Sequence, residues 1–292
     1  GIETTLIFHD GFDLPHFAAF DLLNQDEGKE SLRQYFDTYA EVAVKNKVGI
    51  VFESATWRAS ADWGQLLGYD PDKLADTNRS AISVLSEVRE SHESDDSPMV
   101  ISGCIGPRGD GYNPAFQMSA EAAEAYHTAQ IHTFSETEAD IITAITMTYP
   151  EEAIGITRAA QKADMPVVIA FTTETDGTLP SGHTLAQAID LVDEATNEGP
   201  VYYMINCAHP THYACALERG ERWTTRIRGT RSNASMMSHA ELDEAETLDD
   251  GNPDEFGGEH RMLKHIHGHL NIFGGCCGTD HRHVEALARA CA

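Results

Sequence analysis

Three cysteines follow two short apolar segments and could bind one metal ion. Cys207 directly follows residues 201–206, and Cys276 and Cys277 follow residues 270–273 within the sequence Gly-Gly-Cys-Cys-Gly. Each apolar segment is typical of a short strand that stops at its cysteine. Neighbouring residues of a regular strand point to opposite faces, so the adjacent cysteines can share an ion only where the chain leaves the strand. The flanking glycines allow that bend.

Zinc with three protein ligands keeps a fourth position for water or substrate, whereas structural zinc sites close with four ligands. A shared catalytic zinc site is therefore one hypothesis. The alternatives are that the cysteines are buried small apolar residues, or that Cys276 and Cys277 form an adjacent disulfide and Cys207 is an unrelated core residue. Nearby histidines are further candidate ligands, although most histidines are ordinary surface residues: His209, His212, His265, His267, His269, His281 and His283.

Apolar, β-rich segments recur at intervals that suit βα units. We predict eight strands, at residues 5–9, 48–53, 99–104, 141–147, 167–171, 201–206, 225–230 and 270–273. Helical patterns between them predict helices over residues 31–46, 119–136, 151–163, 185–197 and 282–290. This alternation favours a parallel sheet of the α/β class.

The length of 292 residues fits a single (β/α)8 TIM barrel domain, residues 1–292, because such barrels typically need about 250 residues. An open doubly wound sheet is the alternative, but no G-x-G-x-x-G or P-loop motif follows a predicted strand. Barrel enzymes place their sites where the strands end at the C-terminal rim. Asp10, Cys207 and the Cys276–Cys277 pair all fall at predicted strand ends.

The formal charge of -27 argues against nucleic acid as a partner, because phosphate binding requires a basic surface. No segment approaches about 18 continuous apolar residues, and residues 1–30 lack a signal-peptide pattern. These features predict a cytoplasmic protein that does not bind membranes, and free thiols fit that compartment. Two acidic segments, residues 90–97 and 241–259, are predicted as loops. The second could be a lid, an oligomer contact or a solvated surface excursion.

The cysteine pattern resembles that of a known enzyme family. Asn206-Cys207, the Gly-Gly-Cys-Cys-Gly sequence and Asp10-Gly11 together resemble the homocysteine S-methyltransferase family, which includes betaine-homocysteine and S-methylmethionine-homocysteine methyltransferases. The resemblance runs along nearly the whole chain and includes segments 102–107, 171–182 and 241–251.

In that family three cysteines hold Zn²⁺ and the thiol of homocysteine takes the open position. The resemblance therefore implies that Cys207, Cys276 and Cys277 are the metal ligands of a zinc-dependent S-methyltransferase. Its donor would be a small sulfonium or betaine, and its product methionine. Its partners would be a small-molecule thiol acceptor and a small-molecule methyl donor. The resemblance also leaves open that the protein forms a homo-oligomer.

The resemblance also implies substrate contacts. Asp10 and Gly11 resemble elements of the amino-acid acceptor site, although Asp-Gly is also a common turn. Asn206 and Asn233 would orient the metal ligands or contact substrate, and ordinary loop asparagines are the alternative. A cationic donor suits aromatic faces, for which Phe12, Trp57 and Tyr149 are candidates, with plain packing as their alternative role. The full expected set of substrate-binding residues is Asp10, Gly11, Trp57, Cys104, Thr146, Asn206 and Asn233.

One departure concerns the acceptor. After the fourth predicted strand the family has a Glu-Thr pair whose glutamate binds the amino group of homocysteine, and here the pair is Ile145-Thr146. Segment 53–60 departs from the family pattern too. An isoleucine cannot compensate an ammonium ion, so either Asp10, Glu53 or Glu174 replaces the carboxylate or the acceptor is a different thiol. A zinc- or thiol-binding protein without turnover, and a zinc hydrolase, are the other classes.

Overall fold

A curved parallel β-sheet forms the centre of the structure. The computed structural model describes residues 1–217, 221–244 and 247–292. Within these residues seven strands form one sheet in the order of the sequence, and all neighbouring strands run parallel. The strands are β1 (Ile50–Glu53), β2 (Met99–Ile105), β3 (Ile141–Met147), β4 (Val167–Thr172), β5 (Tyr202–Asn206), β6 (Ile227–Ser232) and β7 (Ile272–Gly275).

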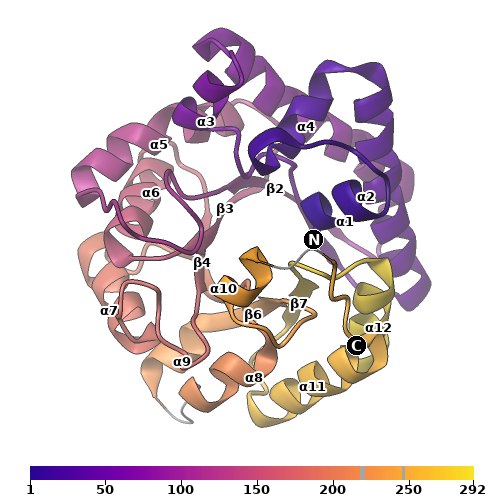
Figure 1. Ribbon diagram of the computed structural model, residues 1–292, viewed down its shortest axis with the longest axis vertical. Coiled ribbons are helices and arrows are strands. Elements are labelled where there is room, and N and C mark those ends of the chain that lie inside the picture. The colour runs from indigo at the N-terminus through magenta and orange to yellow at the C-terminus, as the bar shows by residue number, and fades with distance from the viewer. Residues whose placement is uncertain (218–220, 245–246) are drawn as a thin grey trace.

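Helices surround this sheet on its outer side (Figure 1). The longer helices are α2 (Asp26–Asn46), α4 (Pro71–His92), α5 (Ala120–Ser135), α6 (Pro150–Lys162), α7 (Leu185–Thr196), α11 (Pro253–Ile266) and α12 (His281–Cys291). Shorter elements are α1 (Ile2–Phe8), η1 (Pro15–Phe17), η2 (Ala19–Asn24), α3 (Ala61–Leu66), α8 (Pro210–Tyr213), η3 (Ala214–Ala216), α9 (Arg222–Arg226) and α10 (His239–Asp243). In the described part of the chain no helix is both long enough and apolar enough to cross a membrane.

The main core lies between the sheet and its helices. Apolar side chains of alternate strand residues, such as Phe52, Ile101 and Ile169, pack there against helical residues such as Leu85 and Ile156. Side chains of the opposite strand face form a smaller apolar cluster on the concave side. The central strands β3 and β4 are buried on both faces, as their nearly continuous apolar runs predict, whereas the edge strands β1 and β7 are only partly buried.

The expectation of eight strands closed into a barrel is wrong for the described residues. Seven predicted strands are confirmed, with ends shifted by at most two residues, but residues 5–9 belong to helix α1 and its C-terminal cap. Leu6 is fully buried while Phe8 is 48% exposed, so the segment lacks the one-sided burial of an edge strand. A short apolar run of this kind has no clear period and fits either a helix or a strand. The sheet is barrel-like but open, since β1 and β7 occupy its two ends.

The predicted helices are confirmed: four have bounds within one residue of those observed, and α2 begins five residues earlier than predicted. The second acidic segment, however, is not one long loop. Residues 241–259 contain the end of α10 and the start of α11. Asn252 caps α11 by accepting hydrogen bonds from the N–H groups of Asp254 and Glu255. Residues 245 and 246 of this segment lie outside the described residues.

A buried histidine connects α11 to the end of β6. His260 is fully buried, its Nδ1 donates to the carbonyl of Phe256 (2.8 Å), and its Nε2 accepts from the hydroxyl of Ser232 (2.9 Å). Ser232 also contacts the hydroxyl of Tyr213 (2.7 Å). Both ring nitrogens are therefore used by a neutral imidazole. Desolvation lowers the pKa of His260 to about 4.

Folding stability should consequently fall on acidification. A histidine in the unfolded chain has a pKa of about 6.5. Between pH 6.5 and 4 this histidine is therefore protonated in the unfolded chain but neutral in the folded protein. The difference lowers the free energy of unfolding by about 2 kcal/mol at pH 5. We expect urea denaturation to show a smaller loss of stability from pH 7 to pH 5 in a His260→Gln variant. Equal losses in the variant and the wild type would contradict a neutral His260.

Candidate metal centre

Three cysteine sulfurs lie together beyond the ends of β5 and β7. The Sγ atom of Cys207 is 2.7 Å from that of Cys276 and 3.9 Å from that of Cys277, and all three lie within 4.8 Å of one another. None of the three is in a disulfide. Of the described cysteine, histidine and acidic side chains, these three cysteines lie close enough together to hold one metal ion. The predicted convergence of Cys207, Cys276 and Cys277 is thus present.

The geometry fits a tetrahedral metal ion after a small adjustment. Zinc–sulfur bonds of about 2.3 Å in a tetrahedron separate the sulfurs by roughly 3.8 Å. The Cys207–Cys277 separation matches this value, and Cys276 would move about 1 Å away from Cys207. A shift of that size is small beside the distance that already separates the three sulfurs, which lie within 4.8 Å of one another.

Hydrogen bonds between backbone groups continue past the strand ends and fix the cysteines. The N–H of Cys207 donates to the carbonyl of Arg231 (3.0 Å), and the N–H of Cys276 donates to the carbonyl of Ser232 (2.8 Å). Asn206, Arg231 and Gly274 lie side by side in the register of β5, β6 and β7. The three strands therefore determine the spacing between Cys207 and the cysteine pair.

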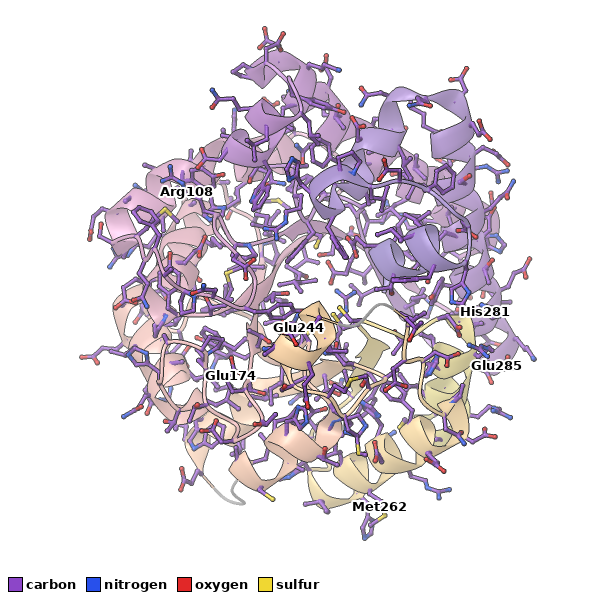
Figure 2. All side chains as sticks on the ribbon, in the orientation of Figure 1. Arg108, Glu174, Glu244, Met262, His281 and Glu285 are labelled. Carbon is purple, nitrogen blue, oxygen red and sulfur yellow. The ribbon has the colours of Figure 1, made fainter. Side chains whose placement is uncertain are left out.

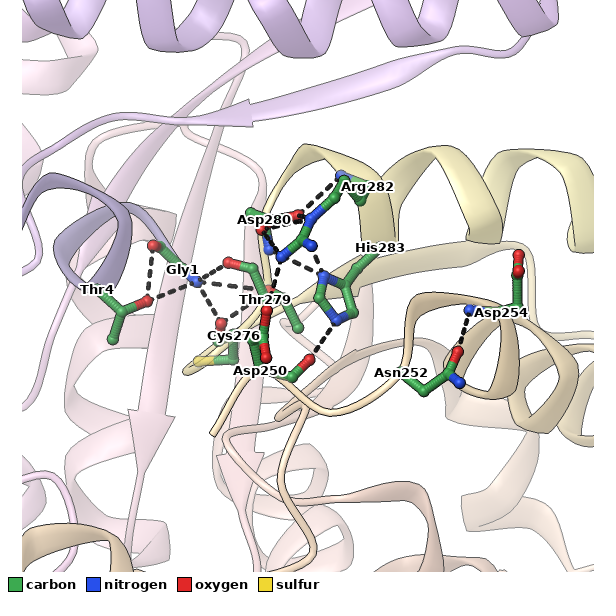
Figure 3. A network of polar contacts seen from close by, with 10 residues as sticks. All are labelled: Gly1, Thr4, Asp250, Asn252, Asp254, Cys276, Thr279, Asp280, Arg282 and His283. Carbon is green, nitrogen blue, oxygen red and sulfur yellow. Dashed lines mark hydrogen bonds and ion pairs between the residues drawn. The ribbon is translucent and has the colours of Figure 1, made fainter. Parts of the chain in front are cut away.

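The Cys276–Cys277 turn is tightly bonded. The N–H and the hydroxyl of Thr279 both donate to the carbonyl of Cys276, and the amino group of Gly1 donates to the same oxygen and to the carbonyl of Thr279 (Figure 3). Gly278 has φ +78°, a conformation that other residues adopt rarely, and a Cβ there would lie 2.5 Å from the carbonyl oxygen of Asp249. This confirms the prediction that glycine lets the chain leave the strand at the cysteines.

The start of α12 supports this turn. Asp280 caps the helix by accepting from the N–H of Arg282, and the Arg282 guanidinium bonds both Asp280 and Asp250. His283 reaches the carbonyl of Asp250 through Nε2 (2.8 Å), so this histidine is a structural partner (Figure 3). The cysteine pair is thereby held between β7 and a fixed helix start.

A strained segment of β3 is hydrogen-bonded to Asn206, the residue that precedes Cys207. Thr146 has φ +67°, which is rare for a β-branched residue, and the register between β3 and β4 shifts between Ala144 and Met147. The side chain of Asn206 holds this conformation, because its Oδ1 accepts from the Thr146 N–H and its Nδ2 donates to the Thr146 hydroxyl, both at 2.9 Å. Backbone strain of this kind concentrates at functional sites.

Asn233 contacts the other cysteine segment. It is buried, and its Oδ1 accepts a hydrogen bond from the N–H of Cys277 (3.1 Å). The two predicted asparagines thus have similar structural roles. Asn206 orients Thr146 beside Cys207, and Asn233 orients Cys277.

A cavity of about 1010 Å³ lies beside the thiols. The predicted residues Trp57, Cys104 and Thr146 line it together with the three cysteines. Ile145 lines it as well and belongs to the concave apolar cluster with Cys104 and Met204. Residues of both edge strands and of α2 and α12 complete the lining, so the cavity extends across the open side of the sheet.

Two partly buried charged side chains, Glu53 and Arg231, line this cavity. Glu53 Oε1 lies 3.9 Å from Arg231 Nη1, while Glu53 Oε2 and Arg231 Nη1 have no hydrogen-bond partner among the described residues. Burial raises the pKa of Glu53, and Arg231 opposes that rise. Hydrogen bonds from Cys207 and Cys277, helped by Arg231, hold the pKa of Cys276 well below its usual range.

Several predicted residues lie elsewhere. Asp10 and Gly11 are exposed, follow helix α1 instead of a strand, and are absent from the cavity lining. Phe12 packs against the main core, and the Tyr149 hydroxyl accepts from the N–H of Met118. His209 is buried beside Glu259, and burial lowers its pKa to about 4. No histidine joins the three-thiol group in the described part of the chain.

Sequence reasoning missed three residues at the thiols: Tyr112, Arg231 and His239. The hydroxyl of Tyr112 lies 3.4 Å from Cys207 Sγ and 3.7 Å from Cys277 Sγ. Its ring stacks on His239, whose Nε2 donates to the carbonyl of Cys207 (2.7 Å). Tyr112 and His239 come from long inter-strand segments without a periodic pattern. The one local signal in the sequence is the Gly-Asp-Gly turn at residues 109–111, which directly precedes Tyr112.

Replacing one cysteine should abolish stable metal binding. In Cys277→Ser a neutral hydroxyl replaces a thiolate ligand, so zinc affinity should fall by about 100-fold or more. We expect about one zinc ion per chain in the wild type after dialysis against a weak chelator, and almost none in Cys277→Ser, by elemental analysis.

Two serine variants provide matched controls. Cys215 is exposed and outside the three-thiol group, and Cys104 lines the same cavity without joining that group. Both Cys215→Ser and Cys104→Ser should retain zinc. Equal zinc contents in Cys277→Ser and these controls would contradict the assignment of the site.

Comparisons with solved structures support the fold. Homocysteine methyltransferase MmuM from Escherichia coli superposes with a TM-score of 0.77 in its metallated form (16% identity) and 0.77 in its oxidized form (17% identity). Its apo form gives 0.71 at 16% identity, and each alignment covers 98% of this chain and 92% of that protein. At these identities the similarity establishes the shared fold. No curated protein sequence matches the chain.

The sequence profile described as homocysteine S-methyltransferase matches residues 1–291, nearly the full length. It agrees with the resemblance carried by the cysteine pattern, and the three cysteines converge as that pattern requires. The chain therefore belongs to the homocysteine S-methyltransferase family.

Proposed function

We propose that this protein is a zinc-dependent S-methyltransferase that moves a methyl group from a small sulfonium or betaine donor to the thiol of homocysteine, giving methionine. The observation that carries this proposal is the group of three free cysteine sulfurs within 4.8 Å of one another beside a large cavity. Membership of a methyltransferase family supports the same reaction class.

The donor set favours zinc. Thiolate sulfur is a preferred zinc ligand, and three protein ligands leave one position for an exogenous group. When bound there, zinc would lower the pKa of an added thiol and keep it ionised at neutral pH. The chain itself holds Cys207 and Cys276 through the backbone bonds to Arg231 and Ser232, and Cys277 through Asn233.

The acceptor subsite differs from the family pattern. Ile145 is 5% exposed and packs in the concave apolar cluster, so it offers no partner for an ammonium group. Glu53 lines the same cavity with one unpaired carboxylate oxygen, and Arg231 lies beside it. We assign the ammonium of the amino-acid acceptor to Glu53 and its carboxylate to Arg231. Asp10 is exposed outside the cavity, and Glu174 lies 3.6 Å from His239 Nδ1.

Glu174 is the weaker candidate. In Figure 2 Glu174 lies inside the ring of helices, whereas Met262 and Glu285 project from the outer surface. It is half-buried and does not contribute to the cavity lining. Its ion-pair partner is His239, so we propose that Glu174 holds the imidazole ring of His239 in place.

The donor subsite includes Trp57. Its indole N–H donates to the carbonyl of Ile145 (3.3 Å), and the guanidinium of Arg58 covers one face of the ring at 4.0 Å. A sulfonium or ammonium donor is attracted by an aromatic face but repelled by that arginine. The donor would therefore use the face of Trp57 that Arg58 leaves open, and would lose its charge as the methyl group departs.

A different thiol acceptor is the second candidate, and Ile145 is the observation that favours it. An acceptor without an ammonium group would pack against the apolar cluster at Ile145 with no unpaired charge. This candidate keeps the same metal site and the same donor chemistry.

We also propose that residues 1–292 form one domain with a cytoplasmic location and small-molecule partners. All six cysteines are free, which suits a compartment that keeps thiols reduced. A homo-oligomer is compatible with the family.

A matched pair of thiols distinguishes the two acceptors. Homocysteine and 4-mercaptobutyrate share a carbon chain, but only homocysteine has an ammonium group. With S-methylmethionine or glycine betaine as donor, we expect the zinc-loaded protein to show a kcat/KM about 30-fold higher for homocysteine, the value of one buried charge pair. Equal values would identify the acceptor as a different thiol, and thiol binding without transfer from either donor would identify a binding protein.

The same assay tests Glu53. A Glu53→Gln variant should lose most of the preference for homocysteine and keep its rate with 4-mercaptobutyrate, because only the ammonium loses its partner. Glu121→Gln, on the exposed face of α5, is the control. A preference that survives in Glu53→Gln would contradict the assignment of Glu53.

A further inference from the structure

A tyrosine hydroxyl covers two of the three site sulfurs. Tyr112 lies in the segment between β2 and α5, while the cysteines follow β5 and β7, so three distant parts of the chain meet here. The Tyr112 Oη atom is 3.4 Å from Cys207 Sγ and 3.7 Å from Cys277 Sγ. These separations suit hydrogen bonds between a hydroxyl and sulfur.

The turn that carries Tyr112 is held by its own bonds. Asp110 Oδ1 accepts from the N–H groups of Tyr112 (2.8 Å) and Asn113 (2.9 Å). Arg58 Nη1 donates to the carbonyl of Gly109 (2.9 Å) and links the turn to the segment after β1. The position of the hydroxyl therefore does not depend on its contact with sulfur.

The base of the segment is anchored in the protein interior. The N–H of Arg108 donates to Glu152 Oε1 (2.8 Å), and buried His127 contacts the same oxygen through Nε2 (2.9 Å). Gly111 lies so close to the cavity wall that a Cβ would be 3.2 Å from Thr146 Cγ2 and 3.3 Å from the Trp57 ring. The segment thus packs against Trp57 and Thr146, two residues that line the cavity.

The ring of Tyr112 is fixed from the other side by His239 of α10. The two rings stack with centroids 4.1 Å apart and planes 26° apart. His239 is buried, its Nε2 donates to the carbonyl of Cys207 (2.7 Å), and Glu174 Oε1 lies 3.6 Å from its Nδ1. His239 therefore ties the tyrosine to the backbone of a cysteine that Tyr112 itself contacts.

From this geometry we propose that Tyr112 is a positioning residue that closes the three-thiol site: its hydroxyl bonds to Cys207 and Cys277 and occupies the space beside these sulfurs that an alkylating reagent or a thiol substrate must enter. The proposal rests on the proposed function only in that the natural competitor is a thiol substrate. Removing the hydroxyl alone should expose the sulfurs and leave the stacked ring in place.

Thiol labelling of the reduced, metal-free protein tests this directly. Iodoacetamide alkylation, followed by mass spectrometry of the cysteine peptides, gives a separate rate for each cysteine. In Tyr112→Phe we expect the alkylation rates of Cys207 and Cys277 to rise about five- to tenfold. A change of this size corresponds to the free energy of one typical hydrogen bond. The rate of exposed Cys215 should stay unchanged. Unchanged rates at both Cys207 and Cys277 would overturn the proposal.

A matched tyrosine controls for general loosening of the cavity. Tyr202 lines the same cavity but does not contact the thiols in the described residues, so Tyr202→Phe should label like the wild type. Equal acceleration in both variants would overturn the proposal in favour of a packing effect. Thermal melting of each variant verifies that the fold is intact.

Homocysteine binding to the zinc-loaded protein provides the second readout. Because the thiol no longer displaces a hydroxyl, its dissociation constant should be about five- to tenfold lower in Tyr112→Phe than in the wild type. Faster labelling with weaker or unchanged homocysteine binding would overturn the competition with substrate. A wild-type protein that takes up no zinc would refute the proposed function, and the labelling result would still decide the role of Tyr112.

Discussion

The register of three parallel strands determines the position of the candidate metal centre. In β5, β6 and β7, Asn206, Arg231 and Gly274 lie side by side, and the next backbone bonds join Cys207 and Cys276 to the carbonyls of Arg231 and Ser232. A shift of one residue in either pair would turn the cysteine segments away from each other. The glycines and Thr279 at the turn, the cap at Asp280, and the contact of His260 with Ser232 all stabilise this one arrangement.

Buried polar groups surround the thiols and determine the local backbone conformation. Asn206 maintains the left-handed conformation of Thr146, and Asn233 bonds the backbone of Cys277. Glu53 and Arg231 bring two charges into an otherwise apolar cavity. Because unpaired buried polar atoms are costly, such atoms mark positions where a substrate group would find a partner. The site therefore combines sulfur ligands, strained backbone and partly satisfied charges within one cavity.

The sequence allowed good predictions where local pattern and structure agree. Seven strands were predicted because their apolar runs stand between helical patterns, and the cysteines because glycines flank them. Residues 5–9 were assigned wrongly, since four apolar or β-prone residues fit either element, and Asp10 was placed at a strand end with them. Tyr112 and His239 reach the thiols through tertiary contacts between long segments, and the strained Thr146 depends on Asn206. No local pattern encodes such contacts.

Zinc-edge X-ray absorption of the reduced protein with and without homocysteine tests the central claim most directly. The account predicts a metal bound by three sulfurs and one lighter ligand that gains a fourth sulfur, at about 2.3 Å, when homocysteine is added. Added 4-mercaptobutyrate should give the same change at a higher concentration. A zinc ion whose sulfur count does not change with either thiol, or a fully reduced protein that binds no zinc, would contradict a three-cysteine centre that activates thiols.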